Sequence, residues 1–168
     1  QCSFCNQKTI TGHTCQPTPQ DVDKAVQTAL KSKGFEYEIA FFGGSFTAID
    51  REYMLSLLKA ANKYIKSNEV KGIRISTRPD CIDEEILTLL KEYGVTSIEL
   101  GAQSMDDEVL LANRRGHTSK DVVNASNLIK SFGFELGLQM MTGLYKDTKE
   151  KALKTAEKII ELEPKTVR

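Results

Sequence analysis

Two cysteines at the start of the chain, Cys2 and Cys5, form a CxxC pattern. Thiolates bind zinc and iron–sulfur clusters, and a CxxC pair can also act as a redox dithiol. A tetrahedral zinc site needs four ligands and an iron–sulfur cluster needs three or four thiolates, so the pair completes neither site alone. A zinc set of Cys2, Cys5, His13 and Cys15 is one completion, and the rest of the chain must decide among these alternatives.

Four motifs farther along the chain combine glycines with polar side chains that could hold a ligand. They are FFGGSFT (41–47), STRPDCID (76–83), ELGAQS (99–104) and NRRGHT (113–118). Paired glycines let a backbone approach a ligand closely, but they also make ordinary turns. Glu99, Gly101 and Gln103 alternate and therefore share one face of a strand. That face is either a functional polar layer inside a barrel or a surface that points outward.

The charged residues of these motifs also have ordinary explanations. Pro79 makes the segment after Arg78 rigid and leaves Arg78 and Asp80 as a charged pair at the end of a strand. Residues 114–117 concentrate positive charge in one loop. Such charges usually face solvent, and a single exposed histidine such as His117 usually has no catalytic role.

Short apolar segments bounded by glycine or polar residues predict buried parallel strands at 37–44, 72–77, 97–103 and 135–141, with a fifth starting at 165–168. Amphipathic patterns between them predict helices that begin near Thr18, Asp50, Asp83, Ser119 and Asp147, the last with Glu150 in a capping-box-like start. Strands that alternate with single helices favour βα units in an α/β fold, either a barrel or an open sheet. Both architectures bind ligands beyond the carboxyl ends of the strands.

The composition excludes several classes. The 168 residues are 40% hydrophobic, with 23 basic and 23 acidic residues, so the charge pattern of a dedicated nucleic-acid binder is missing. No apolar run approaches the roughly 20 residues that span a bilayer, and no signal peptide precedes the first cysteine, so we expect a cytoplasmic protein without a membrane partner. Four cysteines in a domain of this size indicate reduced thiols or metal ligands.

Taken in order, the CxxC with Phe4 before its second cysteine and the four later motifs resemble the radical S-adenosylmethionine superfamily. Within it, the resemblance is to the branch that contains the Elongator catalytic-subunit family and the oxygen-independent coproporphyrinogen oxidase family. Members carry C-x3-C-x2-C, whose three thiolates hold a 4Fe-4S cluster. The resemblance implies that Cys2 and Cys5 are the second and third of these ligands and that the first lies outside the chain.

The resemblance also implies which residues contact S-adenosylmethionine. Gly43, Gly44 and Ser45 stand where relatives hold the methionyl ammonium with backbone groups. Gln103 and Arg115, twelve positions apart as in coproporphyrinogen-oxidase-like relatives, correspond to contacts with the nucleoside and the methionyl carboxylate. An arginine suits a carboxylate because its fork can bind both oxygens.

Three positions depart from the resemblance. Ser76 is a cofactor contact by position, but Elongator-type relatives usually have Glu there. Gln139 stands about where coproporphyrinogen-oxidase-like proteins place an Asp, and Tyr145 replaces the proline of their GLP turn. These departures weaken assignment to either subfamily and leave the cluster ligands unaffected.

The implied fold is a partial TIM-type (β/α)6 barrel of parallel strands, truncated at both ends. Residues 1–168 would form one fragment of a radical S-adenosylmethionine core domain, beginning inside the cluster-binding loop and ending at the start of a late strand. With at most two of three cluster ligands, we expect this fragment alone to be inactive.

The implied activity is reductive cleavage of S-adenosylmethionine by the cluster to give a 5′-deoxyadenosyl radical, with flavodoxin or ferredoxin as an external electron donor. The Elongator-like reading suggests tRNA modification; a small-molecule substrate, such as a porphyrin for an oxidase, is the alternative. A non-catalytic α/β domain that binds zinc or a partner remains the third reading, because Ser76 and Tyr145 depart from the pattern.

Overall fold

Five parallel strands form one sheet in the computed structural model, which describes residues 16–32 and 36–168. The strands are β1 (Glu38–Phe41), β2 (Gly72–Thr77), β3 (Val95–Gln103), β4 (Glu135–Met140) and β5 (Thr166–Val167). Each strand pairs in parallel with the next along the chain, in the order β1-β2-β3-β4-β5. The α/β class and all five expected strands are confirmed, and the described residues hold four of the six βα units expected for the barrel, followed by a fifth strand.

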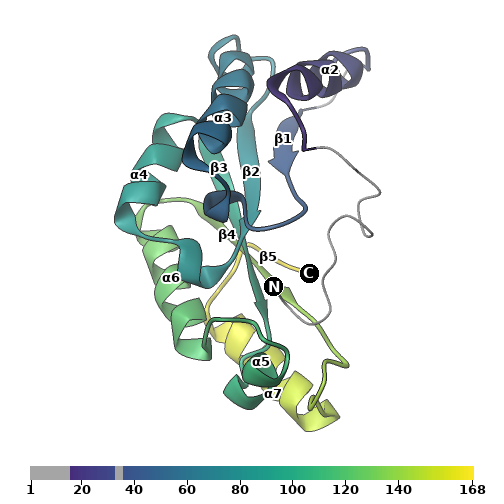
Figure 1. The fold of residues 1–168 in the computed structure, drawn as a ribbon, viewed down its shortest axis with the longest axis vertical. Helices are drawn as coiled ribbons and strands as arrows, with labels where there is room; N and C mark the ends of the chain where they lie inside the picture. Colours follow the sequence, from purple (N-terminus) through teal and green to yellow (C-terminus); the bar gives the residue numbers. More distant parts are fainter. Residues whose placement is uncertain (1–15, 33–35) are drawn as a thin grey trace.

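Helices connect successive strands and cover one face of the sheet, as Figure 1 shows for α3, α4 and α6. The helices are α2 (Pro19–Ala29), α3 (Arg51–Lys66), α4 (Glu84–Glu92), α5 (Asp107–Ala112), α6 (Ser119–Ser131) and α7 (Lys149–Glu161), with 3-10 turns η1 (Phe46–Ala48) and η2 (Pro79–Cys81). Within residues 16–32 and 36–168, none of the helices has the length and apolar character needed to cross a membrane.

Side chains cap the helix starts where the sequence predicts. Thr18 forms a capping box with Asp21 at α2, and the side chains of Asp50 and Asp83 accept hydrogen bonds from backbone amides at the starts of α3 and α4. Such caps satisfy amides that have no partner inside the helix, each worth about 1 kcal/mol.

The expected cap at α7 is wrong by one residue. Thr148 is the N-cap, and its hydroxyl accepts from the Lys151 amide at 3.2 Å. The Asp147 carboxylate instead accepts from the amides of Gly143, at 3.1 Å, and Thr148, at 3.0 Å. Asp147 therefore closes the preceding turn, which leaves the neighbouring threonine to begin the helix.

Alternation along the strands separates an apolar face from a polar one. The apolar side chains pack against the helices and form the core, which includes Ile73, Ile75, Ile98, Leu100, Leu136 and Leu138 from the sheet and Leu58, Leu87, Leu90 and Ile129 from the helices. Burying each such side chain contributes about 1.5–3 kcal/mol to stability. The other face, called the open face below, carries Arg74, Ser76, Ser97, Glu99, Gly101, Gly137 and Gln139.

Gly137 on β4 is required by its neighbours on the open face. A Cβ atom at this position would lie 2.8 Å from Cγ of Glu99 and 2.9 Å from Oγ1 of Thr166, closer than real Cβ contacts. Side chains from the two adjacent strands therefore meet above this glycine.

We predict that Gly137→Ala lowers the free energy of unfolding by about 1–3 kcal/mol, because the added methyl overpacks the sheet. Gly44→Ala is the matched control, since a Cβ there meets no atom within 4 Å; its stability should stay within about 0.5 kcal/mol of wild type. Urea denaturation of the three proteins measures both effects. Equal stability of all three would contradict the crowding at Gly137.

Candidate functional site

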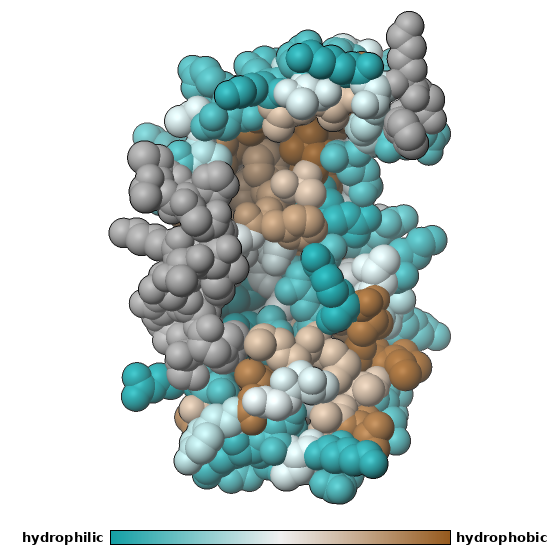
Figure 2. All heavy atoms as spheres, turned by 90° about the vertical axis from the view of Figure 1, so that its right-hand side faces the viewer, coloured by the Kyte–Doolittle hydropathy of each residue, from teal (hydrophilic) through white to brown (hydrophobic). Residues whose placement is uncertain are grey.

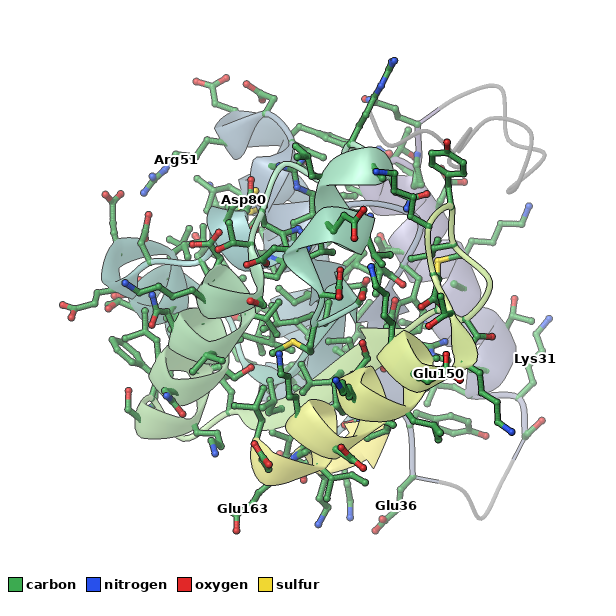
Figure 3. The ribbon with its side chains drawn as sticks, turned by 90° about the horizontal axis from the view of Figure 1, so that it is seen from below. Lys31, Glu36, Arg51, Asp80, Glu150 and Glu163 are labelled. Atoms are coloured by element: carbon green, nitrogen blue, oxygen red, sulfur yellow. The ribbon has the colours of Figure 1, made fainter. Side chains whose placement is uncertain are left out.

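The carboxyl ends of the strands form a rim at one end of the molecule, where the predicted ligand residues gather. Figure 3 views this end and labels Asp80, which lies on η2 after β2. Gly43 has φ of 111°, a conformation that favours glycine, and Gly44 has open space where a Cβ would stand. The predicted glycine pair therefore exposes backbone at the end of β1, with the half-buried Ser45 directly behind it.

A hydroxyl pair fastens the loop after β1 to the end of β2. The hydroxyls of Thr47 and Thr77 lie 2.6 Å apart, and the Thr47 hydroxyl also donates to the carbonyl oxygen of Cys81 at 2.7 Å. Since Thr77 is buried, the bond between the two hydroxyls is partly shielded from competing water. These hydrogen bonds fix the position of the glycine loop relative to the end of β2.

The side chains of Gln103 and Arg115, two of the predicted cofactor contacts, converge above Gly101. A Cβ on Gly101 would lie 3.0 Å from Nε2 of Gln103 and 3.2 Å from Nη2 of Arg115. Arg115 donates from Nη2 to the Gly101 carbonyl oxygen at 2.7 Å. Gln103 has φ of 64°, so the end of β3 turns through a left-handed residue that redirects its side chain. Both side chains are buried.

The loop with Arg115 and His117 is not the solvated turn that its charge suggests. Arg115 and His117 are each only 6% exposed. Nε2 of His117 lies 3.2 Å from the carbonyl oxygen of Ala102, next to the carbonyl that Arg115 binds. Two consecutive carbonyls of β3 thus hold this loop against the sheet.

Arg78 and Asp80 form the charged pair expected at the end of β2. The guanidinium makes a bidentate contact with the carboxylate, with Nε 2.9 Å from Oδ1. Gly116 lies beside this pair, since a Cβ there would be 3.3 Å from Nη2 of Arg78. The pair therefore supports the loop that carries Arg115 and is part of the framework of the rim.

The open face continues below the rim as a polar layer. Ser76 lies on it, half-buried and in register with Glu99. Glu99 accepts a hydrogen bond from Nε2 of Gln139 at 2.7 Å and pairs with Arg168 and, at 3.8 Å, with Arg74. Sequence reasoning missed Arg74 and Arg168 and left Gln139 without a role. Alternation along β2 signals Arg74, because it shares a face with Ser76.

Figure 2 shows the side of the molecule that lies opposite α4 and α6 in Figure 1. The surface is hollowed there, with apolar side chains gathered in its upper part and polar side chains across its middle. The hollow has both an apolar wall and convergent polar groups, the usual combination in a site for an organic ligand.

Cys2 and Cys5, and the alternative zinc ligands His13 and Cys15, lie outside the described residues. In the part of the chain that is described, no cluster of three or more His, Cys, Asp or Glu side chains could hold a metal ion. Burial raises the pKa of the Cys81 thiol, which makes it a poor thiolate ligand.

A separate pocket of about 370 Å³ lies at the opposite end of the sheet. Its lining includes the first residues of three strands, Glu38, Val95 and Glu135. Parallel α/β sheets bind ligands at their carboxyl ends, so we assign function to the rim and not to this pocket.

The buried His117 predicts a dependence of stability on pH. Burial, followed by the charge of Arg115, lowers the pKa of His117 below its ordinary 6.5. As pH falls below 6.5, the unfolded chain takes up a proton that the folded chain resists, so the free energy of unfolding falls, by at most about 1.4 kcal/mol per pH unit. Above 6.5 this contribution is constant.

We predict that His117→Gln, whose amide can still donate to Ala102, removes this contribution. Denaturation of both proteins between pH 5 and 8 measures it, as a wild-type curve that falls more steeply than the variant's on the acid side. Parallel curves would show that His117 titrates alike in the folded and unfolded chains.

Comparisons with known proteins identify the superfamily of the chain. The sequence model of the Radical SAM superfamily matches residues 1–159. The tRNA uridine(34) acetyltransferase of Methanocaldococcus jannaschii is 34% identical over 125 residues, 64% of this chain and 23% of that protein. The heme chaperone HemW of Bacillus subtilis is 30% identical over 122 residues, 71% of this chain and 32% of that protein.

The solved structure of Methanocaldococcus infernus Elp3, with an N-terminal deletion, superposes with a TM-score of 0.73 at 24% identity, covering 89% of this chain and 39% of that one. This likeness confirms the partial-barrel fold. The chain spans less than half the length of each of these proteins. Because the superfamily model extends over nearly the whole sequence, the chain belongs to the Radical SAM superfamily.

Proposed function

We propose that this chain is the S-adenosylmethionine-binding core of a radical enzyme. The observation that carries the proposal is the convergence of Gln103 and Arg115 above Gly101, at the rim that also exposes the Gly43–Gly44 backbone. A 4Fe-4S cluster bound there would supply one electron to the sulfonium, whose carbon–sulfur bond would break to give methionine and a 5′-deoxyadenosyl radical.

The glycine loop fits the ammonium end of the methionyl group. An ammonium needs carbonyl oxygens as acceptors at close range, and backbone without side chains permits that approach. Open space at the Cβ position of Gly44 meets this need, and the Thr47 bonds to Thr77 and Cys81 keep the loop in place. In this proposal Gly43, Gly44 and Ser45 bind and orient the ammonium.

Arg115 and Gln103 fit the other end of the ligand. A guanidinium binds both oxygens of a carboxylate, and Arg115 is already oriented by the Gly101 carbonyl. Gln103 lies beside it and offers both a donor and an acceptor for a nucleoside. Ser76, on the open face below, is proposed as a third contact; its hydroxyl reaches less far than the Glu usual in Elongator-type relatives.

The cluster ligands in the proposal are Cys2 and Cys5 with one further thiolate. An external flavodoxin or ferredoxin would supply the electron, in a cytoplasmic setting. Residues 1–168, which would supply two of the three cluster ligands, would not hold a stable catalytic cluster, because a 4Fe-4S site of this kind needs three thiolates.

For substrate we propose a tRNA, since the acetyltransferase of M. jannaschii that this chain resembles is named for a tRNA uridine. Similarity to the heme chaperone HemW supports a tetrapyrrole as the second candidate. The alternative to an enzyme is a domain without catalysis that binds zinc or a protein partner. Ser76 and Tyr145, which depart from the family pattern, favour this alternative.

Reconstitution tests the cluster directly. The chain is lengthened at its amino end so that a cysteine stands four positions before Cys2, and a matched chain carries alanine there. After anaerobic treatment with iron and sulfide, we expect only the cysteine version to turn brown and, with dithionite, to release 5′-deoxyadenosine from S-adenosylmethionine.

A colourless cysteine version that holds one equivalent of zinc would favour the zinc-binding domain and reject the proposal. Cleavage by residues 1–168 without the added cysteine would refute the need for a third thiolate.

Replacing Arg115 by Lys tests the carboxylate contact. We predict that Arg115→Lys weakens S-adenosylmethionine binding by about tenfold or more, because a single ammonium cannot make a bidentate contact with the carboxylate while it also donates to the Gly101 carbonyl. Equilibrium dialysis measures this loss. Arg114→Lys, at an exposed neighbour, is the matched control and should bind as wild type does; equal affinities in all three proteins would remove Arg115 from the site.

A further inference from the structure

The carboxylate of Glu99 connects four strands of the open face. Its side chain is 10% exposed and lies on β3. It pairs with Arg74 of β2 and with Arg168 directly after β5, and it accepts a hydrogen bond from Nε2 of Gln139 on β4 at 2.7 Å. Glu99 and Gln139 are thus the acid and amide of one partly buried polar network.

This hydrogen bond fixes which way the Gln139 amide faces. An ionised carboxylate only accepts hydrogen bonds, whereas an amide has a donating and an accepting end. The NH2 group of Gln139 must therefore face Glu99, and its Oε1 atom points away from it. Within the described residues, no protein group donates a hydrogen bond to Oε1. Gln139 is only partly buried, so this oxygen is accessible to a ligand.

With the NH2 group on Glu99, the register of β3 and β4 turns Oε1 toward the rim. Glu99 is in register with Gly137, two residues before Gln139 on the same face of β4. Glu99 therefore lies one layer nearer the amino ends of the strands than Gln139 does. The next layer on β3 begins at Gly101, where Gln103 and Arg115 converge.

We propose that Glu99 is a positioning residue that holds the Gln139 amide so that its carbonyl oxygen faces the ligand site. The site then presents a fixed acceptor on β4 and selects a ligand with a hydroxyl or amino donor at that point. Glu99 itself does not touch the ligand. The ligand in this inference is the one that the proposed function assigns to the rim.

Three variants separate this role from a general one in stability. Glu99→Gln keeps the shape but gives Gln139 a partner that can both donate and accept, so the amide is free to turn over. The double variant Glu99→Gln with Gln139→Glu exchanges acid and amide, which restores the pair and leaves an acceptor facing the rim. Glu135→Gln is the matched control, because Glu135 also lies near Arg74, at 3.9 Å.

The probe is S-adenosylhomocysteine, titrated by calorimetry into each protein without a cluster. We expect Glu99→Gln to raise Kd about fivefold to tenfold, the value of one ordinary hydrogen bond. The exchanged pair should return within about threefold of wild type, and Glu135→Gln should match wild type. Thermal melts establish that each variant is folded.

Side-chain NMR of 15N-labelled Gln139 provides a readout that needs no ligand. In wild type and in Glu135→Gln, its NH2 protons should exchange slowly with water, and their chemical shifts should be those typical of a hydrogen bond to a carboxylate. In Glu99→Gln these features should disappear.

Unchanged NH2 signals in Glu99→Gln overturn the positioning role, as does an unchanged Kd, or a raised Kd that the exchanged pair fails to restore. Wild-type protein that binds neither S-adenosylhomocysteine nor S-adenosylmethionine contradicts the proposed function instead. In that case the NMR signals still decide whether Glu99 orients Gln139.

Discussion

A carboxylate held inside a parallel sheet is the constraint on which the open face depends. An unpaired charge at Glu99 would be costly to bury, so the sheet must bring compensating groups to it. Arg74, Gln139 and Arg168 supply these groups from both sides of β3. The space that Glu99 occupies in turn requires glycine at position 137. A shift in the register of any of these strands would separate the carboxylate from its partners. The polar network therefore forms only in the observed register and favours that register over others.

The two faces of the sheet and its carboxyl end have different roles. The apolar face, packed against the helices, supplies most of the stability, and the polar face and the rim carry the residues of the proposed ligand site. At the rim, the important contacts are made to backbone carbonyls: Arg115 to Gly101, His117 to Ala102 and Thr47 to Cys81. Bonds to backbone fix side chains without depending on other side chains. The arrangement therefore tolerates differences such as Ser76 while the convergence above Gly101 is preserved.

Local patterns were sufficient to predict the strands and most helix starts, whereas Gln103 and Arg115 were singled out through the family resemblance. Strand alternation, capping residues and glycine are local signals, and the parallel topology brings strand ends together. The burial of His117 was not predictable, because no local pattern distinguishes a charged loop that faces solvent from one that lies against β3. The partners of Glu99 were missed since they come from strands far apart in the chain. The misplaced start of α7 reflects two adjacent residues, Asp147 and Thr148, that are both good caps.

We propose that S-adenosylmethionine binds at the rim, and not at the opposite end of the sheet. A crystal structure of the protein with S-adenosylhomocysteine tests it most directly. The account predicts that the methionyl carboxylate lies on Arg115, the ammonium on the Gly43–Gly44 backbone and the nucleoside beside Gln103. Ligand found in the pocket between Glu38, Val95 and Glu135, with the rim unoccupied, would contradict the account.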